Sequence, residues 1–464
     1  MATEAHEPSC SPPPTARVLF TVLGALLCVA GWGKLEINLG TWLHVSLGGS
    51  ASGVFRLLLL TYLATRIAAR DIDLRRTGWL REPFVWLCLV AIASPLWNDP
   101  DPAWPVRRHD TAQIFSLVLP ALIVYSSTRY LLDQGFHVFS LPLLRILDVA
   151  LTLVSAQVLV SAPTVLTDLH QVDSSYEHHT HIAMRMVMAM PITLGLLFSD
   201  RRRAEEEGQA ASGPGRQALY LLLLALQAIG LMIAHSRIGF IAFAVVMAHG
   251  ALNATSARLR RAMVVASLGL ALAALAVPQV RASVSSLLHL RTEENYQRRV
   301  VIYQTNLALM ARHPWLGLGF SSRTFLYAGR ALEGETFEYE HPHNLYMQIP
   351  VYLGLPGTAC LVALLISIGA ATRRLRERVA EDQAPLLLGL RGALVGLAVM
   401  NLAETVLSSE RLTFMVPVLI AFVMSWSRLV SAAPQASTGD QTSSPTARMR
   451  ATALLCSTTP ARSV

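Results

Sequence analysis

Long apolar runs are the feature that most constrains this chain. A helix needs about 20 mostly apolar residues to cross the hydrocarbon core of a bilayer, and runs of about that length recur along most of the sequence. Apolar residues make up 53% of the 464 residues, and charged residues only 15%. A soluble fold of this size would need more polar surface to cover its core. The sequence therefore predicts an all-α integral membrane protein.

The apolar runs predict about 12 transmembrane helices. We place them at 18–32, 52–69, 83–97, 111–127, 143–165, 181–198, 217–234, 238–252, 262–278, 345–371, 386–407 and 412–430. The chain then divides into a polar, disordered N-terminus (1–16), helices 1–9 (17–278), a large loop (279–344), helices 10–12 (345–430) and a disordered tail (431–464). This division predicts no soluble domain of independent size.

The distribution of arginine supports this topology. With a cytoplasmic N-terminus, the loops predicted inside hold clusters such as Arg201 to Arg203 and Arg373 to Arg374, whereas the outside loop at 168–179 has no Lys or Arg. This alternation follows the positive-inside rule and predicts that both termini are cytoplasmic. The formal net charge of +8 then comes mainly from arginines in loops next to the membrane lipids. It does not indicate nucleic acid binding.

One connection is far longer than the others. The loop between predicted helices 9 and 10 spans roughly 65 residues, well beyond ordinary loop lengths, and it lies on the periplasmic side of the predicted topology. Its segments 283–290 and 292–312 have helical character. We expect a partly helical element that packs on the ends of the transmembrane helices.

The end of this loop carries a candidate general base. His341-Pro342-His343-Asn344 immediately precedes the next apolar helix, which places His343 at the membrane surface. An imidazole can accept a proton near neutral pH, as activation of a hydroxyl nucleophile requires. A helix cap with an interfacial histidine is the structural alternative. The His-x-His pair also suggests a metal, but no third ligand follows at a familiar spacing, so we predict no metal.

Several arginines near the outer helix ends are candidate anion ligands. Arg237 lies in the short turn after His235-Ser236, and Arg298 with Arg299 gives the large loop a basic face. Arg185 follows His181 by one helical turn, so both share a face. Arginine suits phosphate because its planar fork donates two parallel hydrogen bonds. Interface anchoring and a solvated face are the alternatives.

Familiar cofactor motifs are missing. The sequence contains no P-loop, no Gly-rich dinucleotide turn and no zinc-protease motif. Its five cysteines are scattered without metal-site or disulfide spacing. We therefore predict no cofactor.

Four short motifs follow one another on the predicted outer face. They are Ser236-Arg237 with Gly239, Arg299 with Tyr303, His313-Pro314-Trp315-Leu316-Gly317-Leu318-Gly319, and His343-Asn344-Leu345-Tyr346 with Gly354 and Gly357. In this order they resemble the signature of the O-antigen ligase and polymerase superfamily. Tyr303 is a departure, because the family commonly has Trp there.

The resemblance implies transfer of a glycan from undecaprenyl diphosphate to a sugar hydroxyl of lipid A-core. The reaction would be inverting and metal-independent, at the periplasmic face of the bacterial inner membrane. His343 would be the general base. Arg237 and Arg299, with Arg298 and Arg185, would bind the diphosphate. Secondary candidates are His181, Asn344, His341 and Tyr303.

Three other functions stay open at this point. An O-antigen polymerase and a protein O-glycosyltransferase belong to the same superfamily and use the same kind of donor. A transporter of lipid-linked glycans is the alternative from a different class. Transporters of that kind typically show related halves and ionisable residues near mid-membrane, whereas the candidate charges here lie at the outer helix ends.

Overall fold

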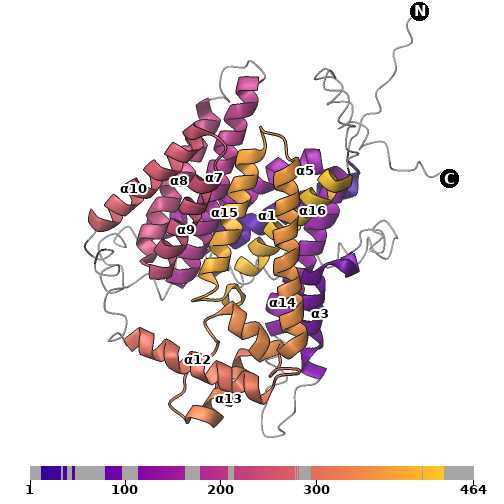
Figure 1. Cartoon of the computed structure of the whole chain (residues 1–464), viewed down its shortest axis with the longest axis vertical. Helices are drawn as coiled ribbons and strands as arrows, with labels where there is room; N and C mark the ends of the chain where they lie inside the picture. The colour runs from indigo at the N-terminus through magenta and orange to yellow at the C-terminus, as the bar shows by residue number, and fades with distance from the viewer. Residues whose placement is uncertain are drawn as a thin grey trace, which may run out of the picture.

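The computed structural model describes residues 12–32, 35–38, 44–47, 79–96, 113–161, 178–206, 214–276, 278, 281, 294–409 and 411–432. Most of them form long helices that lie side by side in one bundle (Figure 1). The main helices are α1 (Pro14–Trp32), α3 (Pro83–Ala93), α5 (Leu119–Ser161), α7 (His179–Glu206), α8 (Pro214–Ala234), α9 (Arg237–Asn253), α10 (Ala257–Ala276), α14 (Leu345–Arg378), α15 (Ala384–Met400) and α16 (Leu412–Ala432).

Helix α7 occupies the centre of the bundle. All but one of its residues from Thr180 to Asp200 are buried, and it packs most extensively against α15. Glycines allow this close approach, because a Cβ on Gly389 would lie 2.3 Å from the carbonyl oxygen of Pro191. A Cβ on Gly195 would meet the carbonyl oxygen of Pro385 at 2.8 Å. Small residues at such crossings are the usual device by which membrane helices pack without a hydrophobic driving force.

Five of the described helices are long and apolar enough to cross a bilayer. They are 116–159 (Ser116–Leu159), His179–Glu206, Pro214–Ala234, Leu345–Arg378 and Leu412–Ala432, and four shorter apolar helices accompany them at Pro14–Cys28, Pro83–Leu96, Arg237–Asn253 and Ala384–Met400. The expected helical, apolar architecture is confirmed. The predicted span 52–69 lies outside the described residues, and the count of 12 stays a prediction.

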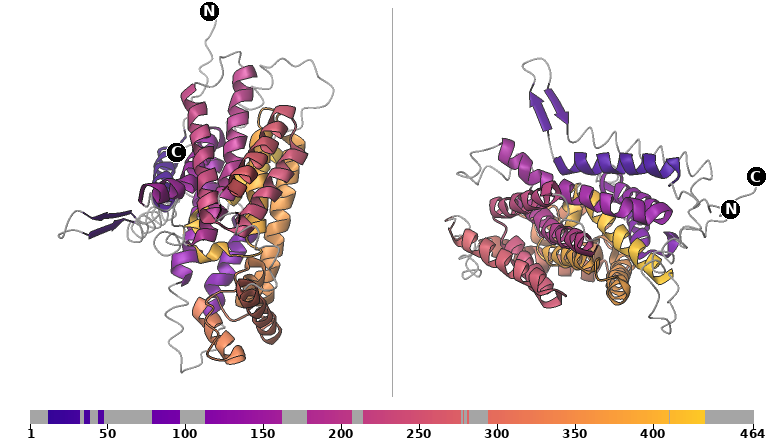
Figure 2. Two further views of the ribbon diagram at one scale, coloured as in Figure 1. Left: turned by 90° about the vertical axis from the view of Figure 1, so that its left-hand side faces the viewer. Right: turned by 90° about the horizontal axis from the view of Figure 1, so that it is seen from above.

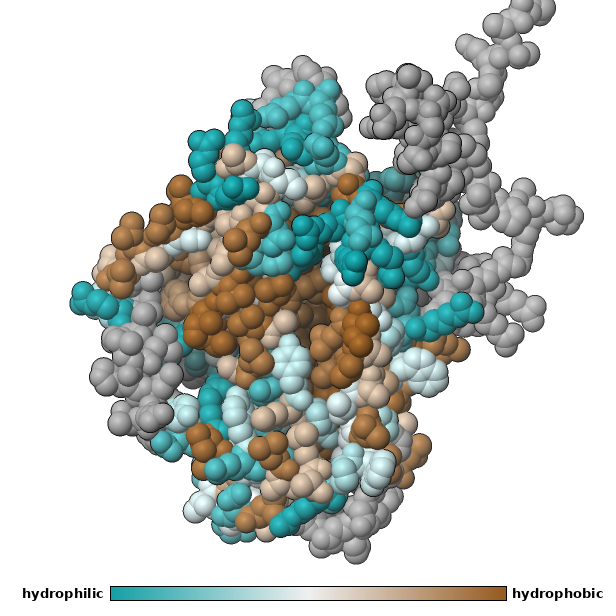
Figure 3. Space-filling view, in the orientation of Figure 1, coloured by the Kyte–Doolittle hydropathy of each residue, from teal (hydrophilic) through white to brown (hydrophobic). Residues whose placement is uncertain are grey.

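The outer surface agrees with a membrane environment. Figure 3 shows apolar side chains across the middle of one face, around a shallow hollow between α15 and α14, with hydrophilic side chains gathered towards the upper end. Exposed apolar side chains on α14 include Val362, Leu365 and Ile366. Others line α8 to α10, among them Leu222, Ile241, Val265, Leu268 and Leu272. Lipid is the environment that accounts for this many exposed apolar residues.

The structure corrects three expectations about elements. The predicted helices 111–127 and 143–165 are joined without a separate loop: a π-helical turn (η3, Ile114–Val118) leads into α5, in which two helices meet at a kink at Gly135, between the two predicted ranges. The predicted helix 386–407 is too long, because α15 ends at Met400. The all-α prediction also missed an antiparallel hairpin of β1 (Leu35–Asn38) and β2 (His44–Leu47), with Leu35 opposite Leu47.

Two helices from the large loop lie across one end of the bundle (Figures 1 and 2). They are α12 (Glu294–Arg312), which confirms the expected helix at 292–312, and α13 (Ser322–Glu333), which the sequence did not predict. The other expected helix, 283–290, lies outside the described residues. The remaining short helices are η1 (Trp79–Arg81), η2 (Ser94–Leu96) and η7 (Val406–Ser408).

The glycine-rich segment after α12 fastens this loop to α14. Gly354 (φ 56°) breaks the α14 helix, and the freed carbonyls of Val351 and Tyr352 accept hydrogen bonds from Leu318 N and Gly319 N, both at 2.8 Å. A Cβ on Gly317 would lie 2.5 Å from the backbone of Tyr352. The glycines that carry the family resemblance are thus needed for close backbone contact. They position the loop that leads to His343.

Candidate active site

The turn after α15 carries the central carboxylate of the candidate site. At the end of the helix, the side-chain oxygen of Asn401 accepts a hydrogen bond from Val406 N at 2.9 Å. Asn side chains often bond to nearby backbone groups in this way, which competes with helical hydrogen bonding and favours a turn. The backbone N–H of Thr405 donates to Glu404 Oε1 at 3.0 Å. Glu404 is 1% exposed. The polar turn therefore places a buried carboxylate at the same end of the bundle as α12.

His343 approaches this carboxylate from the other side. Its Nδ1 lies 3.3 Å from Glu404 Oε2, and its side chain is 23% exposed. His343 has φ 51°, a left-handed conformation that a non-glycine residue adopts only where its surroundings hold it. The next residue, Asn344, caps α14 by accepting hydrogen bonds from Tyr346 N (2.9 Å) and Met347 N (3.3 Å). The cap fixes the backbone just beyond His343.

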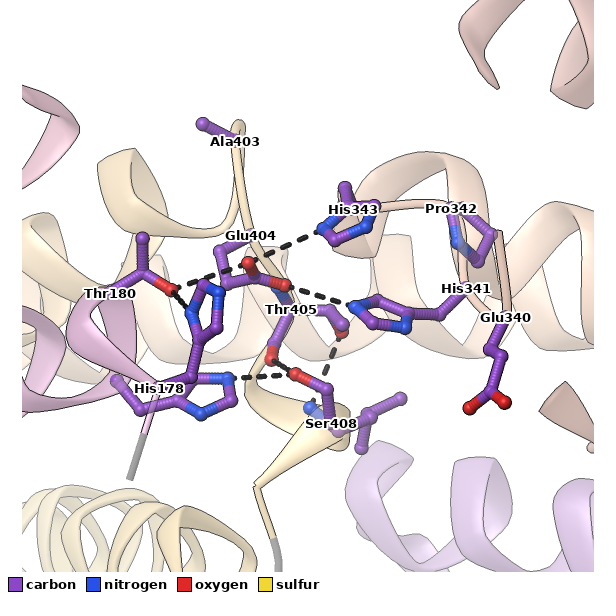
Figure 4. Close-up of polar contacts among 12 residues, drawn as sticks. His178, Thr180, Glu340, His341, Pro342, His343, Ala403, Glu404, Thr405 and Ser408 are labelled. Atoms are coloured by element: carbon purple, nitrogen blue, oxygen red, sulfur yellow. Dashed lines mark hydrogen bonds and ion pairs between the residues drawn. The ribbon is translucent and has the colours of Figure 1, made fainter. Parts of the chain in front are cut away.

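A second histidine and a residue of α7 share the same carboxylate (Figure 4). His341 Nε2 lies 3.5 Å from Glu404 Oε1, and the Thr180 hydroxyl donates to Glu404 Oε2 at 3.3 Å. His178 Nδ1 in turn lies 2.5 Å from the Thr180 hydroxyl. Close by, His181 Nε2 lies 2.8 Å from the Ser408 hydroxyl. Glu404 thus joins the large loop to the N-terminal end of α7.

The electrostatics of the cluster favour an ionised carboxylate and a neutral His343. Burial alone would raise the pKa of Glu404, but the hydrogen bonds from His341 and His343, and the attraction of either ring when it is protonated, outweigh burial and hold that pKa far below its usual range. Burial lowers the pKa of His343, and the charges of His341 and Arg299 lower it further. The hydrogen bond and charge of Glu404 raise it, but the net shift is downward. A neutral imidazole whose Nδ1–H donates to Glu404 keeps its Nε2 lone pair free to accept a proton.

Helix α12 holds the turn from the outside. The Arg299 guanidinium donates from Nη1 to the carbonyl oxygen of Ala403, and Tyr303 donates from its hydroxyl to the carbonyl oxygen of Leu402 at 3.1 Å. Asn344 Nδ2 donates to that same Leu402 oxygen at 3.0 Å. Since Arg299 has five N–H donors in a planar fork, its bond to Ala403 leaves donors for an anion. Arg299, Tyr303, Asn344 and His343 therefore meet around one turn.

The other predicted arginines occupy different environments. Arg298 is exposed on α12, and Arg237 is half-buried as the first residue of α9. There Ser236 caps the helix by accepting from Gly239 N at 3.2 Å, so the Ser-Arg motif is a helix start. Its neighbour His235 has φ 46° and, with His343, is one of two described non-glycine residues with positive φ. Arg185 is fully buried within α7, where His181 is 6% exposed.

Two features of the site depend on tertiary structure and are not predicted from the sequence. No third ligand follows His341 and His343 at a familiar spacing in the sequence, but the fold brings the carboxylate of Glu404 to them, and the three ligand atoms lie within 4.8 Å of one another. Glu404 is not among the site residues predicted from the sequence. An ionisable residue at the end of an apolar run is a signal of function, but its pairing across 61 positions leaves no pattern in sequence spacing.

Comparison with known families supports the resemblance drawn from the motifs. Residues 221–362 match the family described as O-antigen ligase, a segment from α8 into α14 that covers less than a third of the chain. No curated protein matches the chain at a significant level. The matched segment contains Arg237, Arg299, His341 and His343 but not Glu404. Over this segment the chain is similar to the O-antigen ligase family, whose members are membrane glycosyltransferase-like enzymes.

Proposed function

We propose that the protein is an O-antigen ligase of the bacterial inner membrane. It transfers a glycan from undecaprenyl diphosphate to a sugar hydroxyl of lipid A-core at the periplasmic face. The observation that carries the proposal is the contact between His343 and the buried Glu404, made beside Arg299 within reach of solvent. The family match over 221–362 supports the donor class.

His343 acts as the general base in this proposal. Glu404 accepts the Nδ1–H of His343, which fixes the tautomer with a free Nε2, as a carboxylate does for a catalytic histidine in other enzymes. Nε2 removes the proton of the acceptor hydroxyl while that oxygen forms a bond to the anomeric carbon. The bond from this carbon to the lipid diphosphate breaks on the opposite face. Direct displacement of this kind inverts the anomeric centre.

The leaving group determines the role of the arginines. A departing lipid diphosphate gains negative charge, and prearranged cations stabilise such charge more as it develops. Arg299 and Arg237 are the proposed ligands, with Arg298 and Arg185 as further candidates. The apolar hollow between α15 and α14 (Figure 3) suits the lipid part of the donor, since the glycan itself stays in water. The reaction as proposed needs no metal or other cofactor.

A reconstituted transfer assay tests the function. Purified protein in lipid nanodiscs would receive a defined undecaprenyl-diphosphate glycan, with and without lipid A-core. A ligase forms glycan-modified lipid A-core only when core is present. Elongated lipid-linked glycan without core would instead show a polymerase. Movement of the donor across vesicles without any covalent product would show a transporter and contradict the proposal.

A further inference from the structure

We propose that His341, His343 and Glu404 form a binding site for a divalent transition metal ion, Zn²⁺ above all, and that the bound ion inhibits glycan transfer. The binding stands on the geometry of the three side chains, whereas the inhibition rests on the proposed function of His343. The site would give the enzyme a reversible off-state controlled by periplasmic metal.

The distances between the donor atoms fit a zinc ion. His341 Nε2 and His343 Nδ1 lie 3.5 Å and 3.3 Å from the two oxygens of Glu404, and all three ligand atoms lie within 4.8 Å of one another. Zn²⁺ binds imidazole nitrogen and carboxylate oxygen at about 2.0–2.2 Å, and a tetrahedral arrangement then separates ligand atoms by about 3.3–3.5 Å. The two distances from histidine to carboxylate already match this spacing, and only the widest separation, up to 4.8 Å, must shorten for all three groups to share one ion.

The kinds of ligand also match. Two imidazoles and one carboxylate form a common catalytic zinc set that leaves a position for water or another ligand. The charge of the buried Glu404 favours a cation between it and the rings. Thr180 and the backbone N–H of Thr405 already hold the carboxylate in place, an arrangement that orients a metal ligand. The histidine side chains are 28% and 23% exposed, which gives the ion a path of entry.

Metal binding would abolish the base by moving one proton. In the metal-free site, the neutral His343 ring carries its proton on Nδ1 and donates a hydrogen bond from it to Glu404. Nε2 is then free to accept the proton of the substrate hydroxyl. A metal ion takes the Nδ1 lone pair, and the single ring proton then resides on Nε2. His343 can no longer accept a proton there, and Glu404 is engaged by the ion. The same contacts that make His343 a base therefore make the site sensitive to metal.

Direct binding tests the site without reference to activity. Chelator-treated protein would be dialysed against about 10 µM Zn²⁺, and bound zinc measured by mass spectrometry. We expect one zinc per chain in the wild type and in His137→Asn, an exposed histidine of α5. His341→Asn and Glu404→Gln should each lose that zinc while retaining the metal-free thermal unfolding profile of a folded protein. Equal zinc in wild type and either variant would overturn the site.

The transfer assay tests the inhibition separately. Zn²⁺ should lower the transfer rate by about 100-fold or more, as expected for loss of a general base, and excess EDTA should restore it, whereas Mg²⁺ at the same concentration should have no effect. Stoichiometric zinc without loss of transfer would overturn the inhibition. The inhibition would also be overturned if EDTA alone abolished transfer and added zinc restored it, because the ion would then support the reaction. Zinc binding by a protein that shows no transfer at all would refute the proposed function and leave the metal site in place.

Discussion

Two buried carboxylates in this molecule have very different surroundings. Glu404 is 1% exposed and Asp148, in the middle of α5, is fully buried. The hydroxyl of Thr193 on α7 lies 2.8 Å from both oxygens of Asp148, and Gln227 on α8 donates to one of them at 3.3 Å. All partners of Asp148 named here are neutral and buried, whereas Glu404 contacts two histidines that reach solvent.

This difference separates a packing role from a chemical one. The Asp148 network joins α5, α7 and α8 through uncharged partners, as polar residues between membrane helices commonly do, and nothing in it can exchange a proton with a substrate. The Glu404 cluster contains a strained His343, a nearby arginine and a path to water. Burial of a carboxylate in a membrane protein is therefore a weak guide to function, and the exposure of its partners is a better one.

Loss of the general base should lower the transfer rate more than any other change in either cluster. His343→Ala removes the proton acceptor, and general base catalysis contributes about 10²–10⁴-fold. We expect transfer to lipid A-core to fall by about 10³-fold, with normal expression and a normal thermal unfolding profile, as measured in purified membranes. Transfer at the wild-type rate in this variant would show that His343 is not the base. The Glu404 cluster would then have a packing role, like the Asp148 network.

Replacing the arginine should have an intermediate effect. Arg299→Lys keeps the charge but cannot both donate to the Ala403 carbonyl and present a planar fork to a diphosphate. We expect about a 10- to 100-fold loss of transfer, less than the about 10²–10³-fold cost of removing a stabilising donor altogether, because Lys keeps the positive charge. The matched variant is Arg298→Lys on the exposed face of the same helix, which should lose less. The opposite order would exchange the roles of the two arginines.

Threonine variants should give the smallest effect and the cleanest contrast. Thr180→Val removes the donor to Glu404 Oε2, while Thr193→Val removes the donor to Asp148. The first change loosens the group that orients His343. We expect only about a threefold lower transfer rate, because the Thr180 hydroxyl acts on His343 through Glu404 and one hydrogen bond is modest in net free energy. The second should lower thermal stability and leave the rate per folded protein unchanged. Equal rates in both variants would contradict a positioning role for Thr180.

Much of the fold follows from sequence patterns, but the centre of the site does not. Apolar runs placed the helices that end at the site, and motif order identified Arg299, Tyr303, His343 and Asn344. Glu404 lies only four residues beyond the end of α15, where hydropathy alone cannot distinguish the last helical turn from a polar loop. Its contacts with His343 and Thr180 are 61 and 224 positions apart in the chain. Pairings of that kind depend on tertiary packing and leave no periodicity to read.

The most direct test of the account compares one substitution at both carboxylates. Glu404→Gln and Asp148→Asn each replace a buried carboxylate by an amide of nearly the same shape, and transfer from saturating donor would be measured in a single turnover. We predict about a 100-fold loss for Glu404→Gln, because an amide no longer favours the tautomer of His343 with a free Nε2. Asp148→Asn should stay within about twofold of the wild type. Equal rates in the two variants, or a greater loss for Asp148→Asn, would contradict the assignment of the chemistry to the His343–Glu404 cluster.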